Sequence, residues 1–277
     1  MLHGLNEILP NQLSKRYEIL NQMKSCLEEF DYQRITTPTF EPFTGLAAGW
    51  DDYLKEESIQ FFNNQGALMT MRPEMTSPIA RLVSSRKDQL ETPLKLFYTE
   101  NIFRKSHILR KQEIFQVGIE YLGESSIDVD TKVIEVLIEM LNRINIKNFK
   151  IEIGHVENIA NKSDQDIESM IHGDYYNLSE LPAIGSDEIL NKNTYLKQFS
   201  EKIDNKYKPY IQYNLGLVKE ISYYTGIVFN ILVDGVGYII GTGGRYDSLI
   251  KKYGWDIPAI GFAIEFDKLA LALEKEQ

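Results

Sequence analysis

Residues 226–241 read GIVFNILVDGVGYIIG, and this stretch decides the fold class. Two runs rich in apolar and β-branched residues, 226–233 and 236–241, flank the dipeptide Asp234-Gly235. Asp-Gly between two such runs is typical of a type I′ turn that joins antiparallel strands. The stretch therefore predicts a β-hairpin whose return strand covers residues 236–241.

Further strands and helices are expected on both sides of this hairpin. Apolar and β-branched runs predict strands at residues 34–38, 67–72, 94–103, 113–122, 210–215 and 259–264. Apolar residues at helical spacing predict helices at residues 11–30, 128–144 and 246–253, a helix with Pro78 in its first turn, and a last helix from Glu265.

The order of these elements favours one fold class. Hairpin signals with few strand–helix–strand crossovers indicate an α+β protein, in which an antiparallel sheet is flanked by helices. Residues 158–207 are more polar and show weaker periodicity, so we expect a helical insert there. The whole chain, residues 1–277, is then a single core that carries this insert.

Composition and charge limit the function classes. The 277 residues are 43 % apolar and 25 % charged, which is typical of a globular protein and excludes a disordered chain. The formal charge of −10 disfavours nucleic-acid binding, because that affinity comes mainly from Lys and Arg neutralising phosphates. No apolar run is long enough for a membrane helix and no secretory signal opens the chain, so we expect a cytoplasmic protein without a membrane partner.

Metal and cofactor signals are absent from the sequence. It contains neither a Walker A run nor a Gly-x-Gly-x-x-Gly dinucleotide fingerprint. His3, His107, His155 and His172 lack the spacing of metal ligands, so no metal site and no cofactor are expected. Cys26, the single cysteine, cannot form an intrachain disulfide and is predicted to be a packed thiol.

Several short segments carry polar residues of chemical interest. In chain order they are MRPEMT (71–76), FR (103–104), FQVGIE (115–120), LVKEISYYTG (217–226), GTGGRYD (241–247) and AIGFAIEFDKL (259–269). Each alone has a purely structural interpretation: Glu74 as an exposed turn residue, or the glycine run as a tight turn. Gln116 and Glu120 are four residues apart and therefore share one face of a strand.

Together and in this order, the segments resemble the catalytic core of class II aminoacyl-tRNA synthetases, specifically the histidyl enzymes. The opening GLNEILP (4–10) also matches, and ITTP (35–38) resembles the class II dimer-interface motif that ends at Pro38. The resemblance covers almost the whole chain. It implies a class II synthetase-like fold and a homodimer formed about the Pro38 region.

The resemblance also implies a histidine-binding pocket. Its residues, carried over position by position, are Glu74, Thr76, Arg104, Gln116, Glu120, Tyr223 and Tyr224. The chemistry suits an amino acid, because carboxylates receive the α-ammonium and a glutamate with a tyrosine hydroxyl can hold the imidazole nitrogens. Arg104 matches the arginine that meets the carboxylate and the α-phosphate in synthetases.

The nucleotide half of the resemblance is degenerate at four positions. Ser106 stands where the family has a glutamate that touches adenine, and Lys219 and Lys268 stand where it has arginines. Lysine offers neither a planar stacking surface nor a bidentate fork. Glu265 replaces a small residue, and a carboxylate about 5 Å from a phosphate charge would repel it by roughly 3 kcal/mol at an effective dielectric of about 20.

A histidine pocket with a degenerate nucleotide site and no anticodon-binding domain resembles another family, the regulatory subunits of ATP phosphoribosyltransferase. That resemblance implies a non-catalytic chain, with no catalytic residues of its own. It implies a hetero-octamer with the short-form catalytic subunit, which performs the first step of histidine biosynthesis under feedback inhibition by histidine. Residues 158–207 are a candidate docking surface for that subunit.

Two other functions fit parts of the pattern. One is a histidine-activating enzyme of the histidyl-tRNA synthetase type without the anticodon domain, which Ser106, Lys219 and Lys268 argue against. The other is a free-standing histidine-binding module. Histidine-dependent ATP–pyrophosphate exchange separates the enzyme from the regulatory subunit.

Overall fold

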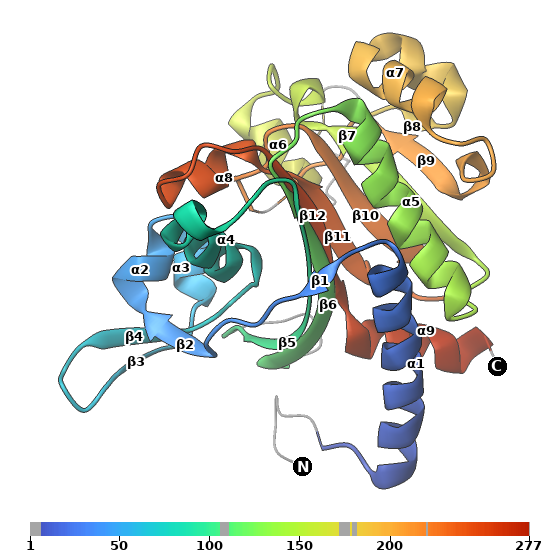
Figure 1. Cartoon of the computed structure of the whole chain (residues 1–277). Coiled ribbons are helices and arrows are strands. Elements are labelled where there is room, and N and C mark those ends of the chain that lie inside the picture. Colours follow the sequence, from blue (N-terminus) through green and yellow to red (C-terminus); the bar gives the residue numbers. More distant parts are fainter. Residues whose placement is uncertain (1–6, 106–110, 172–177, 179–181, 220, 277) are drawn as a thin grey trace.

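A nine-stranded sheet forms the centre of the molecule (Figure 1), in a computed structural model that describes residues 7–105, 111–171, 178, 182–219 and 221–276. In spatial order its strands are β1 (Gln33–Arg34), β5 (Leu94–Phe103), β6 (Glu113–Leu122), β12 (Ala259–Glu265), β11 (Gly241–Arg245), β10 (Ile227–Val233), β7 (Phe149–His155), β9 (Ile211–Asn214) and β8 (Ile184–Gly185). Neighbours run antiparallel except β1 with β5 and β7 with β9. The predicted α+β class is confirmed.

Helices cover both faces of this sheet. One face carries α1 (Pro10–Glu29), α5 (Ile127–Arg143), α7 (Thr194–Lys202) and α9 (Phe266–Glu276). The other carries α2 (Phe43–Ala47), α3 (Asp52–Glu57), α4 (Thr76–Ser85) and α8 (Asp247–Lys252). Alternation along β5 separates the two cores, because Phe97 packs on the first face while Leu96 and Tyr98 pack on the second.

Helix α5 shows how the sequence pattern produces this packing. Val133, Leu137 and Leu141 recur at helical spacing and are fully buried against the sheet. Each such side chain contributes about 1.5–3 kcal/mol by leaving water. Ser126 caps the helix, since its hydroxyl accepts a hydrogen bond from the backbone N–H of Val129 at 3.3 Å.

The hairpin prediction is only partly right. The chain turns at Asp234-Gly235, but the return strand β11 begins at Gly241, so the predicted strand at 236–241 is wrong for all but its last residue. The register pairs Ile231 with Gly241, and residues 234–240 between the two strands form a longer loop. The end of this loop is bonded on both sides, since the backbone N–H of Ile240 donates to the carbonyl of Ile231 in β10 at 3.0 Å and the backbone N–H of Glu265 donates to the carbonyl of Ile240 at 2.9 Å.

Other differences concern short elements. The strand expected at 34–38 is reduced to β1, because only Gln33 and Arg34 pair with β5 before the chain reaches Pro38. A three-stranded sheet of β2 (Phe40–Pro42), β4 (Leu68–Met71) and β3 (Gln60–Phe62) was predicted only at β4. The helices α2 and α3 were not predicted either, since helices of five or six residues are too short to show periodicity.

The segment predicted as a helical insert contains α6 (Asp164–Ile171), a 3-10 helix (Asp187–Lys192) and α7. It also contains β8, which pairs with β9 at the end of the sheet. Leu196 and Phe199 of α7 are fully buried in the core that α5 also lines. The segment thus shares packing with the rest of the chain, and its treatment as an insert stays a prediction.

The structure also describes the single cysteine, the acidic, histidine and cysteine side chains, and the helix lengths. Cys26 is fully buried in α1, and burial raises the pKa of its thiol, as expected for a packed cysteine. Within the described residues, no group of three or more His, Cys, Asp or Glu side chains is arranged to hold a metal ion. In that same part of the chain, no helix is long and apolar enough to span a bilayer.

Candidate functional site

A pocket opens on the face of the sheet that α4 and α8 cover. Its lining comes from the start of α4, strands β5 and β6, the residue after β5, the segment before β10, and strands β11 and β12. Six of the seven predicted site residues line it: Glu74, Thr76, Arg104, Gln116, Tyr223 and Tyr224. The seventh, Glu120, accepts hydrogen bonds from Thr76 and Tyr246, which both line the pocket. The fold therefore brings all seven together from segments far apart in sequence.

Glu74 is held at the N-terminus of α4. Both of its carboxylate oxygens accept from the backbone N–H of Ser77, at 3.0 and 3.1 Å, and the residue is only 4 % exposed. A carboxylate at this end of a helix is stabilised by the unpaired N–H groups and by the helix dipole. Arg104 is held beside it, because its Nε donates to the carbonyl of Pro73 at 2.7 Å.

Glu120 lies in space that a glycine leaves open. On β12, Gly261 pairs with Glu120 of β6, and a Cβ atom added at Gly261 would lie 2.1 Å from Oε2 of Glu120. A side chain at Gly118 would similarly come within 2.4 Å of the Tyr98 hydroxyl. The glycines of the two motifs FQVGIE and AIGFA thus make room for the carboxylate and for the tyrosine beside it.

The electrostatics of the pocket are unusual. Glu74 and Glu120 are both buried, and burial raises the pKa of each carboxyl, that of Glu120 to about 8. Within the described part of the chain, neither carboxylate forms an ion pair with a lysine, arginine or histidine. The charge of Arg104 lowers the pKa of Glu74 only in part. A site with two buried acids and no ion pair on either is suited to a ligand that supplies N–H donors or positive charge.

Three of the positions that the resemblance assigns to the nucleotide half do not line this pocket: Lys219, Glu265 and Lys268. Lys219 donates to the carbonyl of Phe229 at 2.7 Å and to the side chain of Asn230. Lys268 is buried and forms an ion pair with Glu265 at 3.0 Å. Both lysines are thus engaged with this chain's own groups. Ser106 lies outside the described residues.

The structure adds three polar lining residues that the sequence did not single out as site residues: Tyr98, Thr242 and Tyr246. Thr242 and Tyr246 belong to the segment GTGGRYD, so their motif was recognised although their roles were not. Tyr98 stands within the apolar run of β5 and gave no signal of its own. Arg245 of the same motif points elsewhere and forms a buried ion pair with Asp130 of α5.

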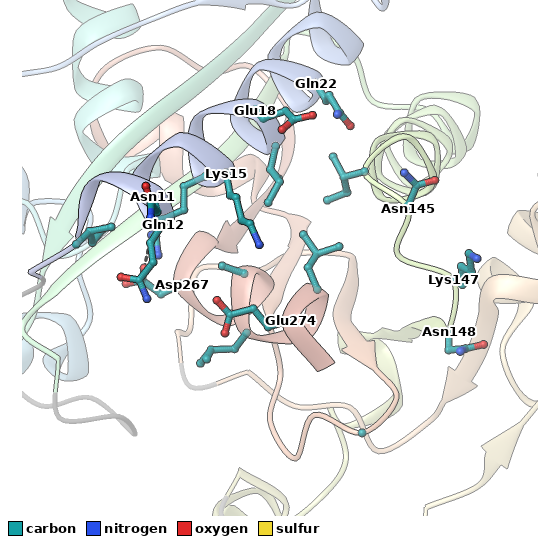
Figure 2. A pocket seen from close by; sticks show the side chains of 18 of the residues that line it. Asn11, Gln12, Lys15, Glu18, Gln22, Asn145, Lys147, Asn148, Asp267 and Glu274 are labelled. Carbon is teal, nitrogen blue, oxygen red and sulfur yellow. Dashed lines mark hydrogen bonds and ion pairs between the residues drawn. The ribbon is translucent and has the colours of Figure 1, made fainter. Parts of the chain in front are cut away.

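A larger cleft lies on the opposite side of the sheet, between α1, α9 and the end of α5 (Figure 2). Its volume is about 1070 Å³. Figure 2 shows amide and charged side chains of both signs around it, among them Lys15, Glu18 and Glu274. Asp267 of α9 ion-pairs with Arg16 and, at 3.1 Å, with Lys111. None of the seven predicted site residues lines this cleft.

Comparison with known proteins agrees with the motif pattern. The model of the family described as histidyl-tRNA synthetase matches residues 4–162 and 158–269. The ATP phosphoribosyltransferase regulatory subunit of Caldanaerobacter subterraneus subsp. tengcongensis is 33 % identical, over 99 % of this chain and 82 % of that protein. The protein of the same name from Clostridium acetobutylicum is 32 % identical over 98 % and 78 %. The chain belongs to the ATP phosphoribosyltransferase regulatory subunit family.

Solved structures support the same assignment. A Bacillus halodurans structure described as an ATP phosphoribosyltransferase regulatory subunit/histidyl-tRNA synthetase superposes with a TM-score of 0.89 at 25 % identity, covering 99 % of this chain and 83 % of that one. Apo histidyl-tRNA synthetase of S. aureus superposes with a TM-score of 0.75 at 25 % identity, covering 100 % and 70 %. The class II synthetase-like fold is confirmed, and the regulatory-subunit family is favoured over a histidine-activating enzyme.

Proposed function

We propose that this regulatory subunit binds L-histidine in the pocket formed by Glu74, Thr76, Arg104, Gln116, Glu120, Tyr223 and Tyr224. In this proposal the bound histidine is the feedback signal of the first step of histidine biosynthesis. The chemistry of phosphoribosyl transfer takes place on a partner chain. The relatives' name, regulatory subunit, supports the existence of that catalytic partner.

The observation that carries the proposal is the pair of buried carboxylates, Glu74 and Glu120: the charge of Arg104 only partly offsets the effect of burial on Glu74, and no cation does so for Glu120 among the described residues. Free histidine supplies what they lack, because its α-ammonium carries three N–H donors and its imidazole one or two more. Its carboxylate needs a cationic partner, and Arg104 at the edge of the pocket offers one. A sugar or a phosphate ester would instead leave the two acids unneutralised.

The proposal includes an assembly. The subunit forms a homodimer about the Pro38 region and joins the short-form catalytic subunit in a hetero-octamer in the cytoplasm. Histidine inhibits by binding more tightly to the inactive state of the assembly, because only a difference in affinity between two states shifts their equilibrium. The segment 158–207 is the candidate contact with the catalytic subunit.

Titration calorimetry with L-histidine tests the pocket. Glu120→Ala should lose roughly 10- to 100-fold in affinity, since a hydrogen bond to a charged group contributes about 1.5–3 kcal/mol. Glu41→Gln is the matched control, because Glu41 is a buried carboxyl on β2 that pairs with Arg81 outside the pocket. Unchanged affinity of Glu120→Ala would place the histidine site elsewhere.

Co-expression with a short-form catalytic subunit tests the assembly. We expect the two chains to co-purify, the catalytic activity to depend on the regulatory subunit, and L-histidine to inhibit it. Histidine-dependent ATP–pyrophosphate exchange by the purified chain alone would favour the synthetase-type enzyme instead. Histidine binding without any association would favour the free-standing binding module.

A further inference from the structure

Each carboxylate oxygen of Glu120 accepts one hydrogen bond from a neutral hydroxyl. Oε1 accepts from Oγ1 of Thr76 at 2.9 Å, and Oε2 accepts from the hydroxyl of Tyr246. Thr76 begins α4 and Tyr246 lies between β11 and α8, so two separate elements aim donors at one carboxylate. Glu120 is 2 % exposed, so these two hydroxyls replace the water molecules that would donate to a carboxylate at the surface.

The position of Tyr246 is set by the rest of the fold. Its backbone N–H donates to the carbonyl of Ala259 on β12 at 2.8 Å. Its ring packs edge-to-face on Tyr223, with the ring centroids 5.8 Å apart, and the residue is 2 % exposed. The preceding residue, Arg245, is tied by ion pairs to Asp130 and Asp247. Contacts of the backbone, of the ring and of the preceding residue thus fix Tyr246 in the position where its hydroxyl donates to Glu120.

The other groups that face Glu120 do not favour its charge. They are the carboxyl of Glu74 and the tyrosines Tyr98 of β5, and Tyr223 and Tyr224 before β10, while Tyr32 acts on Glu120 from the other face of the sheet. In the described residues no lysine, arginine or histidine forms an ion pair with Glu120. Burial and the second carboxyl both disfavour the ionised form, so only the two hydroxyl donors support it.

We propose that Tyr246 is a positioning residue that orients Glu120 and favours the ionised form, which accepts a hydrogen bond from the ligand. This inference rests on the proposed histidine site and adds a residue and a regulatory property to it. Because the ionised fraction of Glu120 changes near neutral pH, the affinity for histidine falls as the pH drops. Tyr246 sets the pH at which that fall begins.

The sign of the effect follows from the hydrogen bond. The Tyr246 hydroxyl lowers the pKa of Glu120, so its removal in Tyr246→Phe raises that pKa further above about 8. A hydrogen bond to a charged group corresponds to a shift of roughly one pH unit. Tyr246→Phe should then bind L-histidine roughly tenfold more weakly than the wild type at pH 7, and only about twofold more weakly at pH 9.

Calorimetry with L-histidine at pH 7, 8 and 9 on the full chain tests the inference. Titration of the ligand itself cancels, because wild type and variant are compared at each pH. The matched control is Tyr207→Phe, which removes a hydroxyl that donates to the carboxylate of Glu139 at 2.6 Å, outside the pocket. It should bind histidine like the wild type at every pH. In a Glu120→Gln background, Tyr246→Phe should no longer change the pH dependence.

The outcomes separate this inference from the proposed function. A Tyr246→Phe deficit that shrinks from pH 7 to pH 9 supports the positioning role. A deficit of equal size at every pH, or none, overturns that role while the histidine site stands. If the wild-type chain binds no L-histidine at any of these pH values, the proposed site itself is wrong.

Discussion

Gly261 has no side chain in a place where the Glu120 carboxylate needs the space. A methyl group there would lie 2.1 Å from Oε2 of Glu120, and also 2.3 Å from the backbone oxygen of Ile119. Gly261→Ala should therefore displace the carboxylate and weaken L-histidine binding at least tenfold in calorimetry, with a loss of about 1–3 kcal/mol in unfolding free energy from overpacking.

The control for this change is Gly45→Ala in α2, where an added Cβ meets no atom within 4 Å. It should bind histidine normally and be at least as stable as the wild type, since alanine is the better helix former. Equal histidine affinity of the two alanine variants would show that Glu120 does not bind the ligand from its present position.

Glu120 also links the site to stability. Its pKa rises from 4.5 in the unfolded chain to about 8 in the folded one, so the unfolded state binds fewer protons across this window and stability falls as the pH rises. Glu120→Gln should raise the unfolding free energy at pH 8 by roughly 1–3 kcal/mol, and leave it unchanged at pH 4. Urea denaturation at the two pH values measures this.

An exposed glutamate serves as the reference for that measurement. Glu18→Gln on α1 should change stability little at either pH. A Glu120→Gln variant that is less stable than the wild type at pH 8 would show that the ionised carboxylate of Glu120 does not destabilise the folded chain. The expected pattern, higher stability with lost binding, is the usual trade-off at a functional site.

At the scale of elements, the segment GTGGRYD ties β11 to α5 and α7. Arg245 pairs with Asp130 of α5, and Asp130 also accepts from the hydroxyl of Tyr195 on α7. Asp130→Ala would leave the buried Arg245 with only its partner Asp247. We expect a loss of about 3–5 kcal/mol in unfolding free energy by urea denaturation, because the buried cation loses its buried carboxylate partner and keeps only the partly exposed one.

The same helix offers the control for this prediction. Asp128, two residues earlier on α5, pairs with Lys202 of α7 at 2.7 Å, but both side chains are about half exposed. Asp128→Ala should cost less than about 1 kcal/mol, as is usual for surface ion pairs. Similar losses of unfolding free energy in Asp130→Ala and Asp128→Ala would show that the buried Arg245–Asp130 pair contributes no more to stability than an exposed pair.

The long elements were predictable from the sequence, whereas several of the shortest were not. β5 and β6 were predicted with their observed bounds, because each is a ten-residue stretch rich in apolar and aromatic side chains. The predicted return strand was wrong because the Asp234-Gly235 signal describes only the local turn. The pairing of β10 with β11 starts at Ile231 and Gly241, which leaves residues 234–240 in a loop. The three residues of β3 have no pattern of their own and depend on β4 for their pairing.

The site was predictable for a different reason. The motif resemblance assigned seven residues to one pocket. Periodicity alone would not have identified them. Tyr98 was missed because a tyrosine in a buried strand gives the same sequence signal as any core aromatic residue. Only the fold reveals that its hydroxyl lies against Gly118 beside the carboxylates.

At the scale of the whole molecule, the sheet separates two cores and the pocket belongs to only one of them. Tyr98, Tyr223 and Tyr246 are part of the core beneath α4 and α8. The core on the other face, with α1, α5, α7 and α9, contains none of the seven predicted site residues. A ligand in the pocket therefore contacts the strands, α4 and the segments before β10 and α8 at once, and favours the folded chain as a whole.

This arrangement predicts that L-histidine raises the melting temperature of the chain. A ligand that binds only the folded state at 100 times its dissociation constant stabilises it by about 2.7 kcal/mol, which corresponds to roughly 5–10 °C for a chain of this size. Histidinol at the same concentration should give a smaller shift, because it lacks the carboxylate that Arg104 would meet. Equal shifts in melting temperature with the two ligands would show that Arg104 does not bind the histidine carboxylate. If L-histidine gives no shift at concentrations that inhibit the assembled enzyme, the inhibitory site lies on another surface.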